Sequence, residues 1–218
     1  MFIVIDGIDG SGKGTQTQIL VDTLIQQGKK VKLLDFPRYW QPSAFGVERY
    51  LNGDYWKNVS AKQASMLYAL DRFDASFEFG PEMWDYDYVI SNRYVSASMI
   101  HQAGKISDPE KRAEFIAWLE DLEYNIFGIP KPDLTIFLNV SPEMSQKLVL
   151  QKQDRSYIKW DKKMDIHEAD KNHLIQAHAS AMDIVQTHPD WLRIDCESQG
   201  NMRDIDAIAA DILATLAL

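Results

Sequence analysis

The strongest chemical signal in the sequence is a glycine-rich loop close to its start. Residues Gly7 to Thr15 read Gly-Ile-Asp-Gly-Ser-Gly-Lys-Gly-Thr, between a short apolar run and a helical pattern. Glycine lets the backbone curl with its N–H groups turned towards a phosphate, and the N-terminus of the following helix adds partial positive charge. The spacing therefore predicts a phosphate-binding loop for ATP. Its predicted contacts are Gly10, Ser11, Gly12, Lys13, Gly14 and Thr15.

Two side chains of this loop have the chemistry of phosphoryl transfer. Lys13 brings a full positive charge to the outer phosphates, and the hydroxyl of Thr15 is a ligand for Mg²⁺. Loops of this kind usually carry Ser or Thr directly after the lysine, whereas Gly14 intervenes here. A glycine turn that binds nothing is the simpler interpretation, but the lysine and the strand–loop–helix context together favour phosphate binding.

Two arginines follow predicted strands and suggest a second anion site. Arg38 comes after Phe36-Pro37 at the end of one strand, and Arg93 comes after Asn92 at the end of another. The carboxyl ends of parallel strands meet at one edge of a sheet, where ligands bind. The planar guanidinium forks suit a monophosphate held between them. The alternative, that each arginine pairs with a carboxylate in a structural salt bridge, stays open.

The helix after Arg93 carries a face that is polar, small and aromatic. Tyr94, Ala97, Ser98 and His101 fall at i, i+3, i+4 and i+7, so they share one side of a helix. Such a face is a poor core stripe, and we interpret it as a pocket wall. A lone histidine at this place could also have a purely structural role.

An earlier helix carries Tyr68, Asp71 and Arg72 on a common face. An aromatic ring there can stack on a nucleobase, and a guanidinium can donate to a base carbonyl. A tyrosine and an ion pair on an amphipathic helix is the more ordinary explanation of the same spacing.

These residues require an alternating series of strands and helices to position them. The predicted strands are 2–5, 31–35, 88–91, 134–140 and 191–195. The predicted helices are 12–27, 61–79, 94–102, 110–126, 142–151, 167–186 and 203–216. This alternation predicts an α/β fold, in which a five-stranded parallel sheet is flanked by helices on both faces.

Length and composition restrict the class of protein. A chain of 218 residues with 45% hydrophobic residues suits one compact domain, 1–218, with a full core. The formal charge of −9 argues against nucleic acid or an anionic membrane as a partner. Cys196 is the only cysteine, which fits a reducing compartment. No apolar run has the length of a signal peptide or a transmembrane helix, so we expect a cytoplasmic protein.

Together these segments resemble the thymidylate kinases, nucleoside monophosphate kinases that phosphorylate dTMP on a P-loop NTPase fold. The resemblance rests on five segments in order and reaches from residue 1 to about 140. They are 7–16, 36–39 (Phe-Pro-Arg-Tyr), 69–72 (Ala-Leu-Asp-Arg), 92–102 and 130–134 (Pro-Lys-Pro-Asp-Leu).

The resemblance implies a role for each matching residue on the acceptor side. Asp9 and Arg38 would face the acceptor sugar and phosphate, and Arg93 would be a second arginine there. Tyr68 would cover the thymine and Arg72 would read one of its carbonyls. The remaining implied contacts with dTMP are Phe36, Ser98, His101 and Gln102.

The resemblance also implies a small mobile lid at 152–166, which would close over ATP. Negative charge grows on the transferred group, and an arginine placed against it accelerates the reaction. The glycine loop contains no arginine, and Arg155 is the only one in the lid segment. The predicted catalytic residues are therefore Lys13, Arg38, Arg93 and Arg155, with Mg²⁺ as cofactor and, by resemblance, a homodimer.

Three positions depart from the family pattern. Asn92 stands where the family has Asp as an outer-shell organiser of Mg²⁺, so an amide would act there through water. Asn139 replaces a second Asp, after the fourth strand. His101 replaces a Tyr near C2′ of the sugar.

Two other functions stay open from the sequence. A nucleoside monophosphate kinase for dUMP, CMP, UMP or AMP would share much of the loop, although adenylate-type enzymes have proline where Asp9 lies. A regulatory protein that binds a nucleotide without catalysis would explain Asn92 and Asn139, but not the retention of Lys13, Arg38 and Arg93 together.

Overall fold

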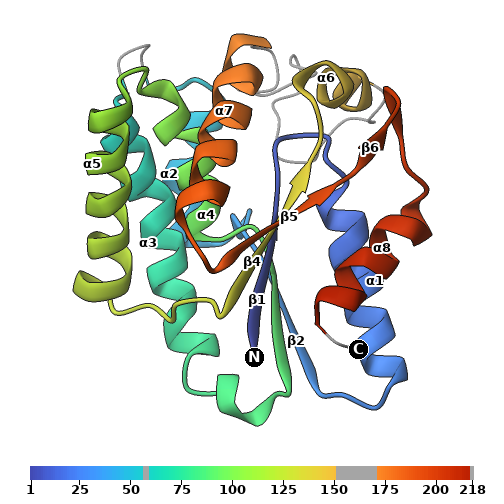
Figure 1. The fold of residues 1–218 in the computed structure, drawn as a ribbon. Coiled ribbons are helices and arrows are strands. Elements are labelled where there is room, and N and C mark those ends of the chain that lie inside the picture. Colours follow the sequence, from blue (N-terminus) through green and yellow to red (C-terminus); the bar gives the residue numbers. More distant parts are fainter. Residues whose placement is uncertain (56–58, 151–170, 217–218) are drawn as a thin grey trace.

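A five-stranded parallel sheet forms the centre of the molecule (Figure 1). The computed structural model describes residues 1–55, 59–150 and 171–216. The strand order is β2-β3-β1-β4-β5. The strands are β1 (Phe2–Asp6), β2 (Val31–Asp35), β3 (Tyr88–Asn92), β4 (Leu134–Asn139) and β5 (Trp191–Asp195). The prediction of five parallel strands is confirmed, and the strand bounds agree with it to within one residue.

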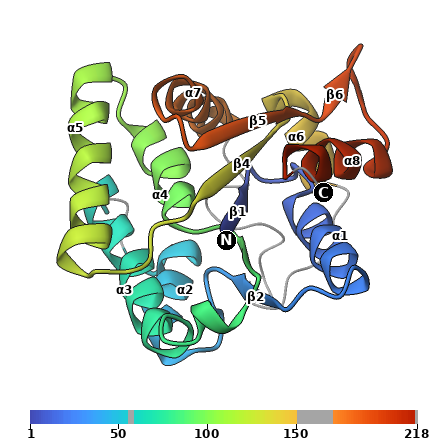
Figure 2. The ribbon, with the colours of Figure 1, turned by 60° about the horizontal axis from the view of Figure 1, so that its bottom comes forward.

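Helices cover both faces of the sheet, as Figure 2 shows from a second direction. One face packs against α1 (Lys13–Gln26) and α8 (Ile205–Thr215), with Leu20, Leu24 and Ile208 in a common core. The other face packs against a larger group of helices. This group comprises α3 (Ala61–Phe79), α4 (Val95–His101), α5 (Pro109–Glu120) and α7 (Lys171–Thr187). The α6 helix (Pro142–Leu150) lies over the carboxyl edge of the sheet (Figure 1).

The central strand β1 is apolar because both of its faces are covered. Its five residues are all buried, which agrees with the prediction from the unbroken apolar run. Its register places Ile5 opposite Asn92 of β3 and Asp6 opposite Phe137 of β4. The carboxyl ends of β1 and β3 therefore lie within one residue of each other and β4 extends two residues further, so the loops that leave these strands meet at one edge.

Several short elements were not predicted. They are α2 (Phe45–Leu51), the two-stranded hairpin β6 (Glu197–Ser198) and β7 (Asn201–Met202), and the 3-10 turns Pro42–Ala44, Met83–Asp85 and Ala103–Lys105. The predicted helix at 110–126 begins at Pro109 and changes to a π-helix over Asp121–Ile126. Elements of two to seven residues carry too few side chains to show a period, which explains why they escape a sequence pattern.

No helix in the ranges that the structure describes has the length and apolar character needed to cross a membrane.

The core beneath α1 provides a test of the packing. Leu24 is fully buried, whereas its neighbour Ile25 is 54% exposed. We expect Leu24→Ala to lower the free energy of unfolding by about 2–5 kcal/mol, since it leaves a cavity in a packed core. Ile25→Ala should change it by no more than about 0.5 kcal/mol. Urea denaturation of both variants measures this, and equal losses would contradict the assigned burial of α1.

Candidate active site

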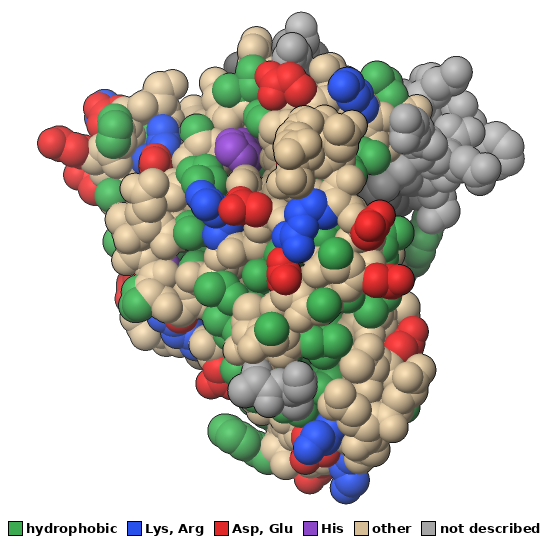
Figure 3. Space-filling view, turned by 45° about the vertical axis from the view of Figure 1, so that its right-hand side comes forward, with side chains coloured by type: hydrophobic (Ala, Val, Ile, Leu, Met, Phe, Trp, Pro, Cys, Tyr) green, Lys and Arg blue, Asp and Glu red, His purple; other side chains and the backbone are tan. Residues whose placement is uncertain are grey.

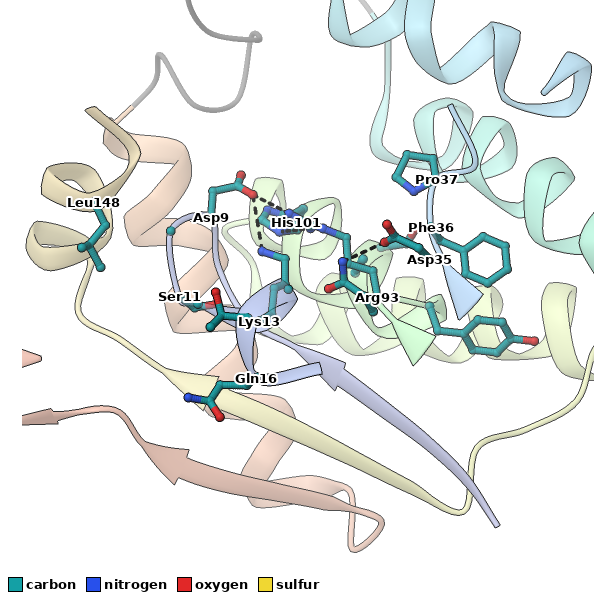
Figure 4. Close-up of a pocket in the computed structure, with 18 of the residues that line it drawn as sticks. Asp9, Ser11, Lys13, Gln16, Asp35, Phe36, Pro37, Arg93, His101 and Leu148 are labelled. Carbon is teal, nitrogen blue, oxygen red and sulfur yellow. Dashed lines mark hydrogen bonds and ion pairs between the residues drawn. The ribbon is translucent and has the colours of Figure 1, made fainter. Parts of the chain in front are cut away.

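A pocket of about 680 Å³ opens at the carboxyl edge of the sheet. Figure 4 shows how side chains from the glycine loop and from the ends of β2 and β3 converge on it. Of the predicted site residues that the structure describes, all except Arg38 line this pocket. They are Asp9, Gly10, Ser11, Gly12, Lys13, Gly14, Thr15, Phe36, Tyr68, Arg72, Asn92, Arg93, Ser98, His101 and Gln102.

The glycine loop leads from β1 into α1 through two left-handed residues. Gly10 has φ of 82° and Gly12 has φ of 86°, a region that side chains rarely tolerate. A Cβ on Gly10 would also lie 2.7 Å from the carbonyl oxygen of Ser145 in α6. The N-terminus of α1 has no side-chain cap and no acidic residue in its first turn. Its backbone N–H groups are therefore oriented for an anion.

Lys13 is buried within the curve of the loop. Its ammonium donates to the carbonyl oxygens of Gly7 and Ile8, both at 3.2 Å, and lies 3.7 Å from the carboxylate of Asp9. These contacts fix the positive charge beside the glycine loop. The arrangement places a cation where the outer phosphates of a bound nucleotide would lie.

Asp9 connects the glycine loop to the opposite side of the pocket. Its carboxylate forms an ion pair with Arg93, and its backbone carbonyl accepts a hydrogen bond from Ser145 of α6. Arg93 has φ of 65°, in the left-handed region, and its N–H donates to the carbonyl of Ile5 at 3.0 Å. This conformation is costly for a residue with a side chain, and here it directs the guanidinium towards the loop (Figure 4).

His101 continues this chain of contacts towards α7. Nη1 of Arg93 lies 3.1 Å from Nε2 of His101, and Nδ1 of His101 lies 3.2 Å from Nε2 of His173. A guanidinium only donates, so Nε2 of His101 accepts and the proton is on Nδ1. Burial lowers the pKa of His101 well below its usual value, with the positive charge of Arg93 adding to the effect and Asp9 opposing it. The imidazole is therefore neutral.

Arg72 is buried in the pocket wall between three helical segments. Its Nε and Nη2 form a bidentate pair with Glu123, both at 2.6 Å, while Nη1 donates to the carbonyl of Tyr94 at 3.2 Å and Nη2 to Ser98 at 3.2 Å. The π-helical segment carries Glu123, which is fully buried. Four of the five N–H donors are used among the described residues, which leaves one on Nη1 for a ligand.

Arg38 is directed away from the pocket. Its guanidinium forms ion pairs with Asp71, Asp74 and Glu78 along α3, and it donates to Ser43 at 3.0 Å. The salt-bridge alternative that the sequence left open therefore describes Arg38 in this structure. Arg93 differs, because it pairs with Asp9 and still lines the pocket.

The wall between Arg72 and the pocket mouth is aromatic and polar. Tyr68 packs edge-on against Tyr50, with 6.2 Å between the ring centroids, and Phe36 packs against Tyr94, with 5.6 Å between the ring centroids. Gln102 is buried and accepts from Lys105 at 2.7 Å. The four residues of the predicted helix face, Tyr94, Ala97, Ser98 and His101, all line the pocket.

Part of the pocket could not be predicted from the motifs. Met202, Arg203, Ile205 and Ile208 line it from the chain end, where α8 packs beside α1. Asp35 also lines it, from the last position of β2. The hydrophobic pattern of α8 indicated a packed helix, but nothing in it indicated that its first turn would border the glycine loop.

Figure 3 shows Lys and Arg interspersed with Asp and Glu on the face that it presents.

The predicted lid at 152–166, with Arg155, lies outside the described residues.

The sheet, the glycine loop and the converging cations define a P-loop NTPase fold with a second polar wall facing the loop. A family model described as Thymidylate kinase matches residues 5–202. The chain therefore belongs to the thymidylate kinase family.

Individual relatives agree with this placement. Thymidylate kinase from Mycobacterium tuberculosis is 33% identical over 147 residues, 66% of this chain and 68% of that protein. Thymidylate kinase from Schizosaccharomyces pombe is 32% identical over 143 residues, 66% of this chain and 62% of that protein. The solved structure of thymidylate kinase from Candida albicans covers 99% of this chain and 90% of its own, with a TM-score of 0.76 at 21% identity. This likeness confirms the fold.

The neutral state of His101 predicts how stability depends on pH. An unfolded histidine titrates near pH 6.5, whereas folding lowers the pKa of His101. Below about pH 6.5 the unfolded chain thus binds a proton that the folded chain does not, and stability falls by up to about 1.4 kcal/mol per pH unit. Urea denaturation between about pH 7 and pH 5 should show this slope reduced in His101→Gln. Identical slopes in the two proteins would contradict a buried, neutral His101.

Proposed function

We infer that this protein transfers the γ-phosphoryl group of ATP to dTMP, giving ADP and dTDP. The observation that carries the proposal is the Asp9–Arg93 ion pair, which joins the donor loop to an arginine on the opposite wall of the same pocket. A phosphate loop alone serves many activities, whereas an anion site facing it fits a phosphate acceptor. Family membership supports dTMP as that acceptor and gives no support to the adenylate-type rival or to a regulatory protein without catalysis.

The donor nucleotide would lie along the N-terminus of α1. The backbone N–H groups from Gly10 to Thr15 would hold its phosphates, with Lys13 at the outer two. Its base would extend towards Met202, Arg203 and Ile205, where apolar side chains and a guanidinium plane border the pocket.

The acceptor would lie between α3 and α4. Arg93 would hold its phosphate, Tyr68 would cover the base, and the remaining N–H donor of Arg72 would meet a base carbonyl. Phe36, Ser98 and Gln102 complete the wall, and the ring of His101 stands on the helix face beside Arg93.

Two predicted catalytic arginines have weaker support. The carboxylates of α3 hold the guanidinium of Arg38, so its contact with the acceptor phosphate requires those ion pairs to break. The role of Arg155 against the transferred group, and the lid that carries it, stay predictions from the sequence.

Catalysis in this arrangement depends on position and charge. A phosphate dianion is already a nucleophile, so its oxygen attacks the γ-phosphorus in line and no general base is needed. Lys13 and Arg93 both line the pocket and both contact the carboxylate of Asp9, so both would lie near the transferred group and offset its negative charge. Asp9 keeps the two cations at a fixed separation.

Mg²⁺ fits the donor set at the carboxyl edge. Thr15 offers a hydroxyl in the first turn of α1, and Oδ1 of Asn92 is a buried oxygen without a hydrogen-bond partner among the described residues. These two residues would hold the ion, Asn92 through water, and the ion would neutralise phosphate charge.

The buried thiol of Cys196 is consistent with the cytoplasmic location that we infer. The homodimer stays an inference from the family.

A coupled assay of ADP formation tests the activity. With MgATP, dTMP should be turned over in preference to dUMP, dCMP, CMP and AMP, and Lys13→Ala should lower kcat at least ~100-fold because its charge acts in the transition state. Turnover with none of these acceptors despite ATP binding would refute the kinase, and preference for CMP or AMP would refute dTMP as substrate. A near-wild-type rate in Lys13→Ala would contradict the loop assignment.

Arg72 provides a test of the acceptor site. Arg72→Ala should weaken dTMP binding far more than ATP binding, because a base carbonyl left unpaired in a buried site is costly. Calorimetric titration of each nucleotide measures both affinities. Because the substitution leaves Glu123 without its partner, Arg72→Lys serves as a second variant that keeps the charge and loses the planar fork. Equal losses for both nucleotides in both variants would indicate a structural Arg72.

A further inference from the structure

Every strand of the central sheet ends on an Asp or an Asn. The terminal residues are Asp6, Asp35, Asn92, Asn139 and Asp195. The register places Asp35 beside Asn92 and Asn139 beside Asp195. In both pairs the asparagine Nδ2 donates to the neighbouring carboxylate at 2.7 Å. Each amide on an inner strand therefore has a carboxylate on the adjacent outer strand.

Only the Asp35–Asn92 pair lines the pocket. Figure 4 shows Asp35 close to Arg93, at the ends of the strands. The second carboxylate of the pocket, Asp9, is neutralised by ion pairs with Arg93 and Lys13. Asp35 differs, because among the described residues its carboxylate forms the hydrogen bond from Asn92 and no ion pair.

A carboxylate without an ion pair is unfavourable in a pocket that binds phosphates, since like charges repel. A bound divalent cation removes the repulsion, because it attracts the phosphates and the carboxylate together. The placement of Asp35 is thus explained if a cation binds between it and the nucleotide.

The amide oxygen of Asn92 supports the same location. Its Nδ2 is used by Asp35, while Oδ1 is buried with no partner among the described residues. Buried oxygens in proteins normally have a partner, often an ordered water. Asn92 therefore has a neutral oxygen for a water or cation, and it holds the carboxylate of Asp35 next to that position.

We propose that Asp35 is a positioning residue for Mg²⁺, and that it supplies from β2 the negative charge which the amide of Asn92 cannot supply from β3. Asn92 links the two, because it donates to Asp35 and accepts from the hydration shell of the ion. The proposal rests on the inferred use of MgATP, but it does not depend on which nucleotide is the acceptor.

Metal binding tests this independently of turnover. The probe is Mn²⁺, followed by electron paramagnetic resonance in the presence of a non-hydrolysable ATP analogue and without acceptor. Asp35→Asn keeps the shape of the side chain and removes its charge, so we expect Mn²⁺ affinity to fall about 10- to 100-fold. Affinity for the analogue in EDTA should stay unchanged or increase, because a repulsive charge has been removed.

Two further variants make the outcome specific. Asp195→Asn removes the equivalent carboxylate of the pair outside the pocket and should leave Mn²⁺ binding unchanged. The double variant Asp35→Asn, Asn92→Asp exchanges the two side chains, so the negative charge moves from β2 to β3 and an amide still lies beside a carboxylate. It should restore the Mn²⁺ affinity. Melting temperatures establish that all three variants fold.

The opposite results would overturn the proposal. Undiminished Mn²⁺ affinity in Asp35→Asn, equal losses with and without metal, or failure of the double variant to recover would each show that Asp35 is structural. Failure of the wild-type protein to phosphorylate dTMP would refute the proposed function, while the Mn²⁺ titration would still decide the role of Asp35.

Discussion

The ion pair between Asp9 and Arg93 is the interaction on which the rest of the site depends. It connects the turn after β1 with the turn after β3, two strands that are neighbours in the sheet. Because Lys13 also approaches Asp9, one carboxylate holds two cations near each other without their mutual repulsion opening the pocket. The glycine loop and the turn after β3 are therefore joined in one charged unit, in which two cations share one carboxylate although the whole chain has a formal charge of −9.

The surroundings of this unit hold it in place from several directions. Asp6 accepts from Ser96 of α4 and from the N–H of Gly7, Ser145 of α6 bonds the backbone of Asp9, and His101 supports Arg93 from α4. Each support is a short polar contact between buried or partly buried groups, so each also fixes an orientation. This explains why Arg93 can adopt a left-handed conformation that would be unfavourable in isolation.

Arg38 and Arg72 look alike in the sequence, but the structure places them differently relative to the pocket. Arg38 and Arg72 both belong to motifs and both have carboxylates in reach, but only Arg72 lines the pocket. The difference arises from their partners: Asp71, Asp74 and Glu78 of α3 hold Arg38 away from the pocket lining, while the buried Glu123 of the π-helical segment holds Arg72 within it. Since Glu123 is 51 residues from Arg72 in the chain, no local pattern could reveal this pair.

Local chemistry in the sequence was sufficient to determine the sheet, its long helices and the glycine loop. Apolar runs, helical periods and the Gly–Lys spacing act over a few residues, and the strand bounds agree with them to within one position. Only the tertiary structure decided which arginine faces the pocket, that Asp35 stands beside Asn92, and that the start of α8 borders the glycine loop. These features depend on strand register and helix docking, which bring together residues far apart in the chain and leave no signal in any one segment.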